Sequence, residues 1–199
     1  HTLGGQILEP STLPMAQQEA LKRAFDRAVA AAYPAGQAPA YRVHFHKSRI
    51  GPNAFALPGG IIVMTDELVK LVDGDVEVVV GVLAHELGHV EHRHGMRMVV
   101  QTGLLGVITS VAFGDFSGWL AAAPVVLGQA AYSRSAEREA DQASIRILKA
   151  AGLSPLAMVR FFEKIGEKEE GRGRSPLGIA FASHPADADR IAVFRDAAR

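Results

Sequence analysis

The residues His85-Glu86-Leu87-Gly88-His89 match the pattern H-E-x-x-H in a stretch that the sequence predicts to be helical. Residues four apart on a helix share a face, so the imidazoles of His85 and His89 could bind one metal ion. Glu86 lies beside them and could take a proton from a water on that metal. Two ligands and a general base in this spacing indicate a zinc enzyme that hydrolyses peptide bonds.

The residues before this motif argue against a chance match. Residues 76–84 are almost entirely apolar, which predicts a buried helix. Two histidines and a glutamate on a buried helix need partners, because unpaired buried polar groups cost free energy. A metal ion is the simplest partner for them.

A catalytic zinc site usually has three protein ligands, so a third must come from elsewhere. The metzincin pattern is excluded, because Gly95 occupies the position of its third histidine and His92 that of its glycine. His92 and His94 could bind metal in principle, but the helix carries them away from a metal centred between His85 and His89. We expect them to be solvated or to support the ligands from outside.

A better third ligand lies in residues 133–141, which are predicted to open another helix. Glu137 and Asp141 are four residues apart and share a face, whereas Glu139 points elsewhere. Glu137 could bind the zinc while Asp141 holds a ligand imidazole by its other ring nitrogen, as is common in zinc sites. The alternative is a solvated acidic face that pairs with the arginines of the same segment.

These two motifs in this order resemble a known family. H-E-L-G-H followed by S-R-S-A-E-R-E-A-D is similar to the zinc endopeptidases that include the CAAX prenyl proteases, the heat-shock membrane protease HtpX and the periplasmic protease BepA. Residues 53–60 resemble the edge-strand segment of that family, and residues 61–65 the strand after it. Ser183-His184-Pro185 with Arg190-Ile191 resembles its C-terminal motif. The resemblance spans roughly residues 40 to 195.

The resemblance implies both a fold and a site. The fold class would be α+β, a mainly helical zincin-type metallopeptidase domain with a small mixed β-sheet and an active-site H-E-x-x-H helix. His85, His89 and Glu137 would bind one zinc ion per chain, with Glu86 as the base.

Two further regions are expected to serve the reaction. His184 and Arg190 are candidates for stabilising the negative oxygen that forms on the attacked carbonyl, and the resemblance supports both; the alternatives are a loop residue and a surface cation. The strand that begins with Asn53, Ala54 and Phe55 would bind unfolded polypeptide as an added strand, through backbone hydrogen bonds. A second role for His184 is to reach the zinc in a resting enzyme and displace the water.

Composition indicates a single domain. The chain has 199 residues, and we expect a helix and linker over residues 1–39 and a catalytic core over residues 40–199. The formal net charge of +0 provides no global field for nucleic acid. A cysteine count of 0 excludes disulfides, thiol catalysis and cysteine-bound zinc.

The hydrophobic pattern predicts the elements that must position these residues. His44 and His46 fall on the polar face of a half-buried strand, where we expect solvation rather than metal binding. The expected elements are a helix over 14–32, a strand over 41–46, two short strands within 53–65, helices that begin near residues 65 and 133, and helices over 155–166 and 185–199.

Residues 98–131 are unusually apolar. Their two apolar stretches are shorter than the roughly 20 residues of a membrane span and are broken by glycines, so we expect no transmembrane helix. A helical hairpin packed on the domain is expected, and the alternative is a surface that touches a membrane or a partner protein. The chain begins at His1 without a visible signal peptide, and the resemblance favours a periplasmic or otherwise exported enzyme whose leader has been removed.

The sequence therefore predicts a zinc-dependent endopeptidase in quality control of unfolded or misassembled exported proteins. One alternative is a zinc-binding chaperone or adaptor with little proteolytic activity, which the presence of Glu86 disfavours because a structural site needs no base. Another is a binding module in which H-E-x-x-H is fortuitous.

Overall fold

The computed structural model describes residues 8–49, 51–97, 132–170, 184 and 188–199. The apolar residues 98–131 lie outside this part, and with them the expected helical hairpin. Within the described residues, no helix is long and apolar enough to cross a membrane. The elements follow one another as β1 (Leu8–Pro10), α1 (Met15–Ala32), β2 (Arg42–Ser48), β3 (Ala54–Leu57), β4 (Ile61–Thr65), α2 (Asp66–Leu71), α3 (Val76–Glu91), α6 (Arg134–Ala150), α7 (Leu156–Glu170) and α9 (Ala188–Ala197).

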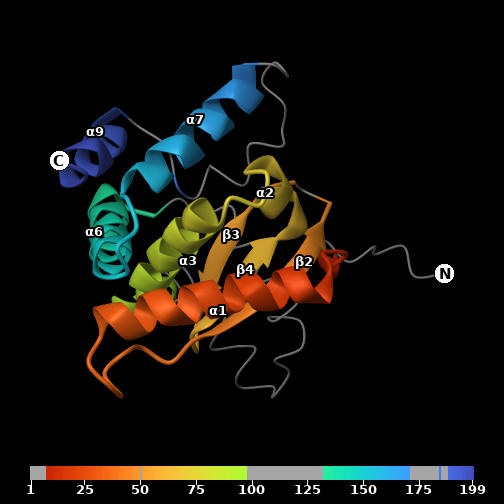
Figure 1. The fold of residues 1–199 in the computed structure, drawn as a ribbon, viewed down its shortest axis with the longest axis horizontal. Coiled ribbons are helices and arrows are strands. Elements are labelled where there is room, and N and C mark those ends of the chain that lie inside the picture. Colours follow the sequence, from red (N-terminus) through yellow and green to blue (C-terminus); the bar gives the residue numbers. More distant parts are fainter. Residues whose placement is uncertain (1–7, 50, 98–131, 171–183, 185–187) are drawn as a thin grey trace, which may run out of the picture.

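The sheet has four strands in the order β1-β2-β4-β3 (Figure 1). It is mixed, because β2 runs parallel to β4 while β1 and β3 pair antiparallel with β2 and β4. The small mixed sheet and the mainly helical α+β class are as expected, and β3 lies at an edge as predicted. The sequence pattern missed β1, which draws the N-terminal segment into the sheet.

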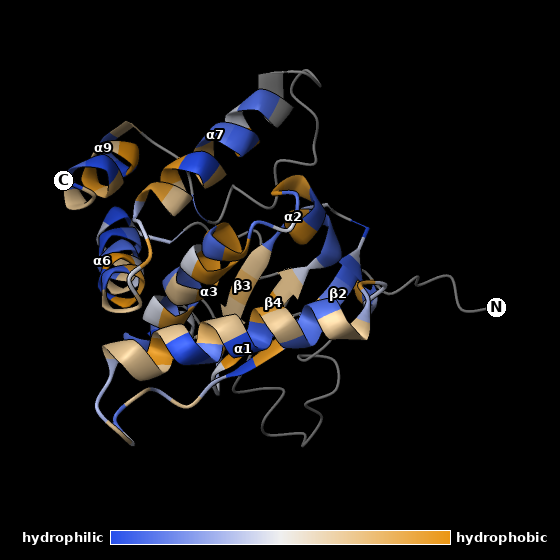
Figure 2. Ribbon diagram, in the orientation of Figure 1, coloured by the Kyte–Doolittle hydropathy of each residue, from blue (hydrophilic) through white to orange (hydrophobic). Residues whose placement is uncertain are grey.

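Helix α3 forms the centre of the molecule. Asp75 caps its first turn by accepting from the amides of Glu77 and Val78, and every residue from Val78 to His89 is buried. Figure 2 shows hydrophobic colours along much of α3 and mainly hydrophilic colours on α6. The prediction of a buried H-E-x-x-H helix is confirmed.

The predicted amphipathic helix near the N-terminus is also present. Leu21, Phe25 and Val29 are the buried side chains of α1 that the helical spacing predicted, and they join the core around α3. The segment before α1 is held by Asp66, whose carboxylate accepts from the Ser11 hydroxyl and from the amide and hydroxyl of Thr12.

Helix α6 lies very close to α3, and a glycine allows this. A Cβ atom added at Gly88 would come within 2.7 Å of the Ala140 Cα and 2.9 Å of the Ala143 Cβ. The hydroxyl of Ser144 donates to the Gly81 carbonyl at 2.9 Å, one turn further along the contact. The close approach brings the first turn of α6, which is capped by Ser133, beside the H-E-x-x-H motif.

Candidate metal centre and active site

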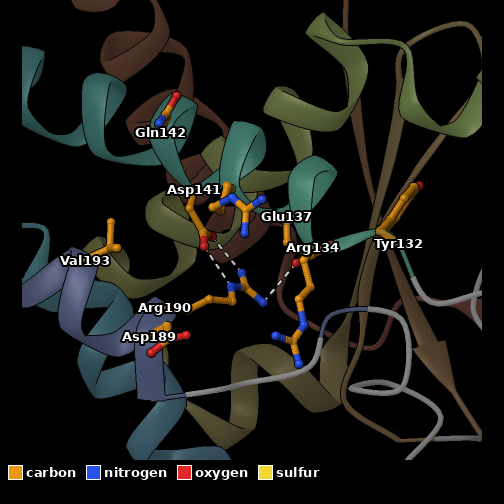
Figure 3. A pocket seen from close by; sticks show the side chains of 9 residues that line it. Tyr132, Arg134, Glu137, Asp141, Gln142, Asp189, Arg190 and Val193 are labelled. Carbon is orange, nitrogen blue, oxygen red and sulfur yellow. Dashed lines mark hydrogen bonds and ion pairs between the residues drawn. The ribbon is translucent and has the colours of Figure 1, made fainter.

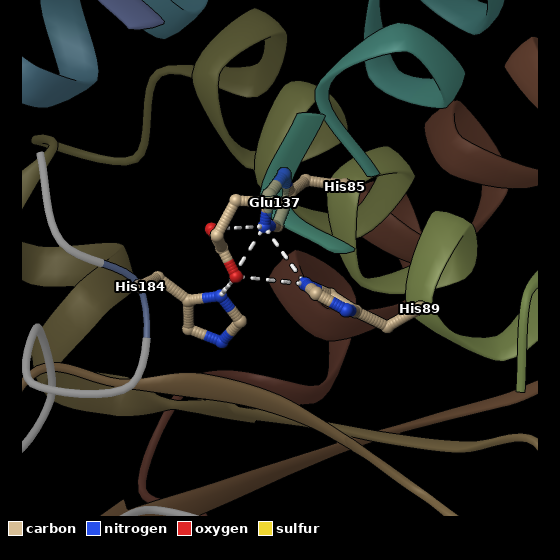
Figure 4. Close-up of side chains that lie close together, drawn as sticks. All are labelled: His85, His89, Glu137 and His184. Atoms are coloured by element: carbon tan, nitrogen blue, oxygen red, sulfur yellow. Dashed lines mark hydrogen bonds and ion pairs between the residues drawn. The ribbon is translucent and has the colours of Figure 1, made fainter. Parts of the chain in front are cut away.

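Four side chains from three places in the sequence meet beside the end of α3 (Figure 4). His85 and His89 come from α3, and Glu137 comes from the first turn of α6. His184 lies shortly before α9. The two Nε2 atoms of His85 and His89 are 3.1 Å apart, so the helical spacing places both imidazoles at one point as expected.

The donor atoms of these four side chains form a compact cluster. The Nδ1 of His184 lies 3.3 Å from the Nε2 of His85 and 3.0 Å from the Oε1 of Glu137. Carboxylate oxygens of Glu137 lie 3.5 Å from the Nε2 of His85 and 3.5 Å from the Nε2 of His89. Tetrahedral zinc with ligands at roughly 2.0–2.2 Å places those ligands about 3.3 Å from one another. The cluster therefore fits a zinc ion in both donor type and spacing.

Glu86 lies beside the donor cluster without belonging to it. Its Oε1 is 3.6 Å from the Nε2 of His184, and its Oε2 is buried with no hydrogen-bond partner among the described residues. Burial raises the pKa of Glu86, and the nearby His184 and His85 offset this only in part. A buried carboxyl with a raised pKa is a stronger base than an exposed one, as a general base requires.

Asp141 and Arg190 support the cluster from behind. The Oδ1 of Asp141 lies 2.9 Å from the Nδ1 of His85, where the sequence predicted a contact with a ligand imidazole. Burial would lower the pKa of His85, but the carboxylates of Asp141 and Glu137 outweigh it and raise the pKa to about 9. Burial would likewise raise the pKa of Asp141, but Arg190 and His85 hold it low. These ion pairs lock the orientation of His85.

Arg190 binds carboxylates in this structure. Its Nε and Nη2 donate to Asp141 at 2.7 and 2.6 Å, and its Nη1 lies 2.9 Å from Glu137 (Figure 3). The guanidinium also lies over the ring of Phe162 at 5.1 Å. The structure thus places Arg190 next to the site as expected, in contacts that position Glu137 and Asp141.

A cavity of about 290 Å³ opens between α6 and α9 next to these ion pairs. Figure 3 shows Tyr132, Arg134 and Glu137 along one side of this cavity, with Asp189 and Arg190 facing them. Glu137 therefore borders both this cavity and the donor cluster.

Asn53 is the predicted substrate-binding residue with the most distinctive surroundings. It is 1% exposed, and among the described residues neither polar atom of its side chain has a hydrogen-bond partner. Asn53 and Ala54 line a small cavity together with His85 and Glu86, whereas Phe55 is buried elsewhere along β3. An unpaired buried amide is costly, so its position beside Glu86 indicates a ligand contact.

Sequence reasoning missed Tyr132 and the contact of Glu139 with His94, both of which lie around His89. The Nδ1 of His89 lies 2.9 Å from the Nδ1 of His94, and the Nε2 of His94 lies 2.8 Å from the Oε2 of Glu139. The ring of Tyr132 stacks on His89, with centroids 4.0 Å apart. His94 was expected to be solvated or to support the ligands, and at 3% exposed it is buried against His89. His92 is half-buried, and His44 is exposed as expected.

Comparison with known proteins agrees with this geometry. Residues 15–198 match the family described as Peptidase family M48. The chain belongs to this family. It is a metallopeptidase domain, and the family expected from the motifs is confirmed.

Several curated proteins of this family are similar to the chain. Metalloprotease LoiP of Escherichia coli strain K12 is 34% identical over 169 residues, which cover 81% of this chain and 63% of that protein. The beta-barrel assembly-enhancing protease of Yersinia pestis is 30% identical over 161 residues, covering 73% of this chain and 32% of that protein. The mitochondrial metalloendopeptidase OMA1 of Schizosaccharomyces pombe is 31% identical over 144 residues, covering 70% and 42%. The chain therefore spans less than two thirds of each of these relatives.

Proposed function

We propose that this chain is a zinc endopeptidase in which His85, His89 and Glu137 hold the metal and Glu86 is the general base. The cluster of donor atoms, all within 4.8 Å of one another, is the observation that carries the proposal. The buried carboxyl of Glu86 beside this cluster separates the proposal from a purely structural zinc site, which needs no base. Membership of a peptidase family supports the same reading.

The chain's own residues divide the chemistry among them. When bound, zinc would supply Lewis acidity that lowers the pKa of a water and polarises the scissile carbonyl. Glu86 takes the proton from the attacking water and later delivers it to the leaving amine. Asp141 and Arg190 hold His85 and Glu137 in place, so little reorganisation is needed during the reaction.

The substrate would be an extended, unfolded segment of polypeptide. β3 is an edge strand and can accept an added strand through its backbone. The side-chain amide of Asn53 has no hydrogen-bond partner among the described residues and lines the same small cavity as Glu86, so it would bond the substrate main chain near the cleaved peptide. Recognition of this kind reads the backbone more than the side chains, and it favours broad specificity for unfolded segments.

His184 has two candidate roles in this proposal. With its Nδ1 inside the donor cluster, it would act as a fourth ligand in a resting enzyme and withdraw before water and substrate enter. In the working enzyme it would donate to the negative oxygen, and Arg190 is the second candidate for that role. We expect His184→Ala to lower the peptidase rate by about a hundredfold at matched zinc content, as for loss of an oxyanion donor.

Rates of His184→Ala and Arg190→Ala against the parent distinguish these roles. A rise for His184→Ala would mean that displacement of the resting ligand dominates. Rates equal to the parent for both variants would exclude both residues from the reaction.

The test of the whole proposal is metal content together with digestion of an unfolded protein. We expect about one zinc per chain in the parent, as for a three-ligand catalytic site, and a large loss of zinc in Glu137→Ala. Undiminished zinc in Glu137→Ala would mean that another residue is the third ligand. A parent that binds zinc tightly but cleaves no unfolded protein would support the alternative of a chaperone or adaptor.

The biological setting follows from the relatives and belongs to the proposal. One similar protein is named for enhancing β-barrel assembly, which supports a role in quality control of exported proteins and a periplasmic or otherwise exported location. Fractionation of cells that carry the full-length protein, with a periplasmic marker as control, tests the location.

A further inference from the structure

We propose that Glu139 and His94 form a relay that fixes the tautomer and orientation of His89, so that its Nε2 lone pair faces the metal. This inference rests on the proposed function, because it concerns how a metal ligand is held. It assigns a positioning role to two residues outside the ligand set.

The relay is a continuous line of short contacts between described atoms. The Oε2 of Glu139 lies 2.8 Å from the Nε2 of His94, and the Nδ1 of His94 lies 2.9 Å from the Nδ1 of His89. The Nε2 of His89 then lies in the donor cluster, 3.1 Å from the Nε2 of His85. His94 and His89 are 3% and 1% exposed, so the contact between their rings is shielded from water, whereas the Glu139 side chain at the outer end of the line is 42% exposed.

The protons on this line can be placed by elimination. The carboxylate of Glu139 only accepts, so the Nε2 of His94 carries a proton and donates. A neutral His94 then has a bare Nδ1, which must accept from a proton on the Nδ1 of His89. With that nitrogen protonated, a neutral His89 has its lone pair on Nε2, the atom that faces the metal. In metal sites, the hydrogen bond made by the ring nitrogen that does not bind the metal selects the tautomer of a ligand histidine in this way.

The backbone after α3 is shaped to allow this contact. Arg93 has a φ of 55°, a left-handed conformation that costs a non-glycine residue energy, and His94 follows directly. The turn lets His94 contact a residue five positions earlier. Tyr132 stacks on the ring of His89, so the ring is confined as well as hydrogen-bonded.

The two ligand histidines are thus supported differently. His85 meets the carboxylate of Asp141 directly at 2.9 Å. His89 meets the carboxylate of Glu139 only through His94. His94 is therefore the residue through which the orientation of His89 can be tested, as Asp141 is for His85.

The same side chains suggest a rival reading. His92, His94 and Glu139 have donor atoms within 4.8 Å of one another and could hold a second metal ion. Such an ion would take the lone pair on the Nε2 of His94 and move its proton to Nδ1. The tautomer of His89 would then be reversed, so the rival reading and the relay cannot both hold in the zinc-loaded enzyme.

The experiment compares zinc dissociation constants, measured by competition with a chelator of known affinity. His94→Phe keeps a ring but removes the acceptor, and we expect zinc affinity to fall about 10- to 100-fold. His94→Asn places an oxygen close to the lost Nδ1 and should recover most of this affinity. His92→Ala, at a half-buried neighbour outside the relay, should match the parent. If His94 only filled space, phenylalanine would preserve zinc affinity at least as well as asparagine. Higher zinc affinity in His94→Asn than in His94→Phe therefore supports the hydrogen bond.

A second measurement reads the tautomers directly. Nitrogen-15 NMR of the zinc-loaded parent should show His94 protonated on Nε2 and His89 protonated on Nδ1. Parent-like zinc affinity in His94→Phe, a proton on the Nδ1 of His94, or a second zinc lost in His92→Ala would each overturn the relay. If the parent binds no zinc, or if His89→Ala binds it as the parent does, the proposed metal site itself is wrong.

Discussion

The two halves of α3 bury their side chains in opposite surroundings. From Val78 to Ala84 the helix lies among aliphatic and aromatic side chains of the core. In the second half, His85, Glu86 and His89 lie among ionisable groups of α6 and the segment before α9, while Leu87 stays in the apolar core. Both halves are equally buried, so burial alone does not distinguish residues of the hydrophobic core from residues of the candidate active site.

The difference lies in how polar groups are satisfied. Away from the donor cluster, Asp66 of α2 accepts from Ser11 and Thr12, and Ser144 donates to the Gly81 carbonyl. On the other side, polar atoms of Glu86, His184 and Asn53 are buried without hydrogen-bond partners among the described residues. Unsatisfied buried groups cost stability, and here they gather where a metal and a substrate would satisfy them.

The largest expected effect is that of Glu86→Gln on activity. Peptidase activity should fall about a hundredfold or more, because the general base is lost. The zinc content should be unchanged, and the free energy of unfolding should not decrease, because burial already disfavours the charged form of Glu86. Digestion rates, metal content and urea unfolding of both proteins check this. Cleavage at the parent rate would show that Glu86 is not the base.

Leu83→Ala tests the apolar half of α3. Leu83 is 0% exposed, and its truncation should lower the free energy of unfolding by about 2–5 kcal/mol. The folded fraction should bind zinc with the affinity of the parent. Chemical denaturation gives the first quantity and chelator competition the second. A large loss of zinc affinity would show that the two halves are coupled.

Gly88→Ala tests the contact that joins α3 to α6. The new Cβ would meet the Ala140 Cα at 2.7 Å, which we expect to cost about 1–3 kcal/mol and to weaken zinc binding by moving Glu137. Gly166→Ala in α7 is the matched control, since nothing lies within 4 Å of its Cβ. The control should gain up to about 1 kcal/mol from helix propensity. Equal unfolding free energies for the two variants would contradict the close contact.

Asp66→Asn should have the smallest effect, about 1 kcal/mol at neutral pH, because asparagine keeps part of the hydrogen bonding. Burial would raise the pKa of Asp66, but the bonds from Ser11 and Thr12 outweigh it and lower the pKa below 3.8. Its contribution is therefore present above the unfolded pKa and lost as the pH falls through the folded value. Urea unfolding of both proteins between pH 7 and pH 2 should show the difference shrinking below about pH 4. A constant difference would exclude the ionised carboxylate as its source.

The local elements followed from the sequence because their signals are local. The apolar run before the motif predicted a buried helix, and the i, i+4 spacing placed His85 and His89 at one point. A helix was predicted to open within residues 133–141, and α6 begins at Arg134. Each of these inferences needs only the periodicity of one helix.

What joins these elements was decided by tertiary structure. The close packing at Gly88 brings α6 to α3, and no local pattern reports that distance. Arg190 lies on the carboxylates of Asp141 and Glu137, contacts that the sequence did not predict. His94 and Glu139 reach His89 through a left-handed turn and a neighbouring helix, so their spacing carries no signal. Such contacts depend on how separate helices pack, and only the folded chain determines that.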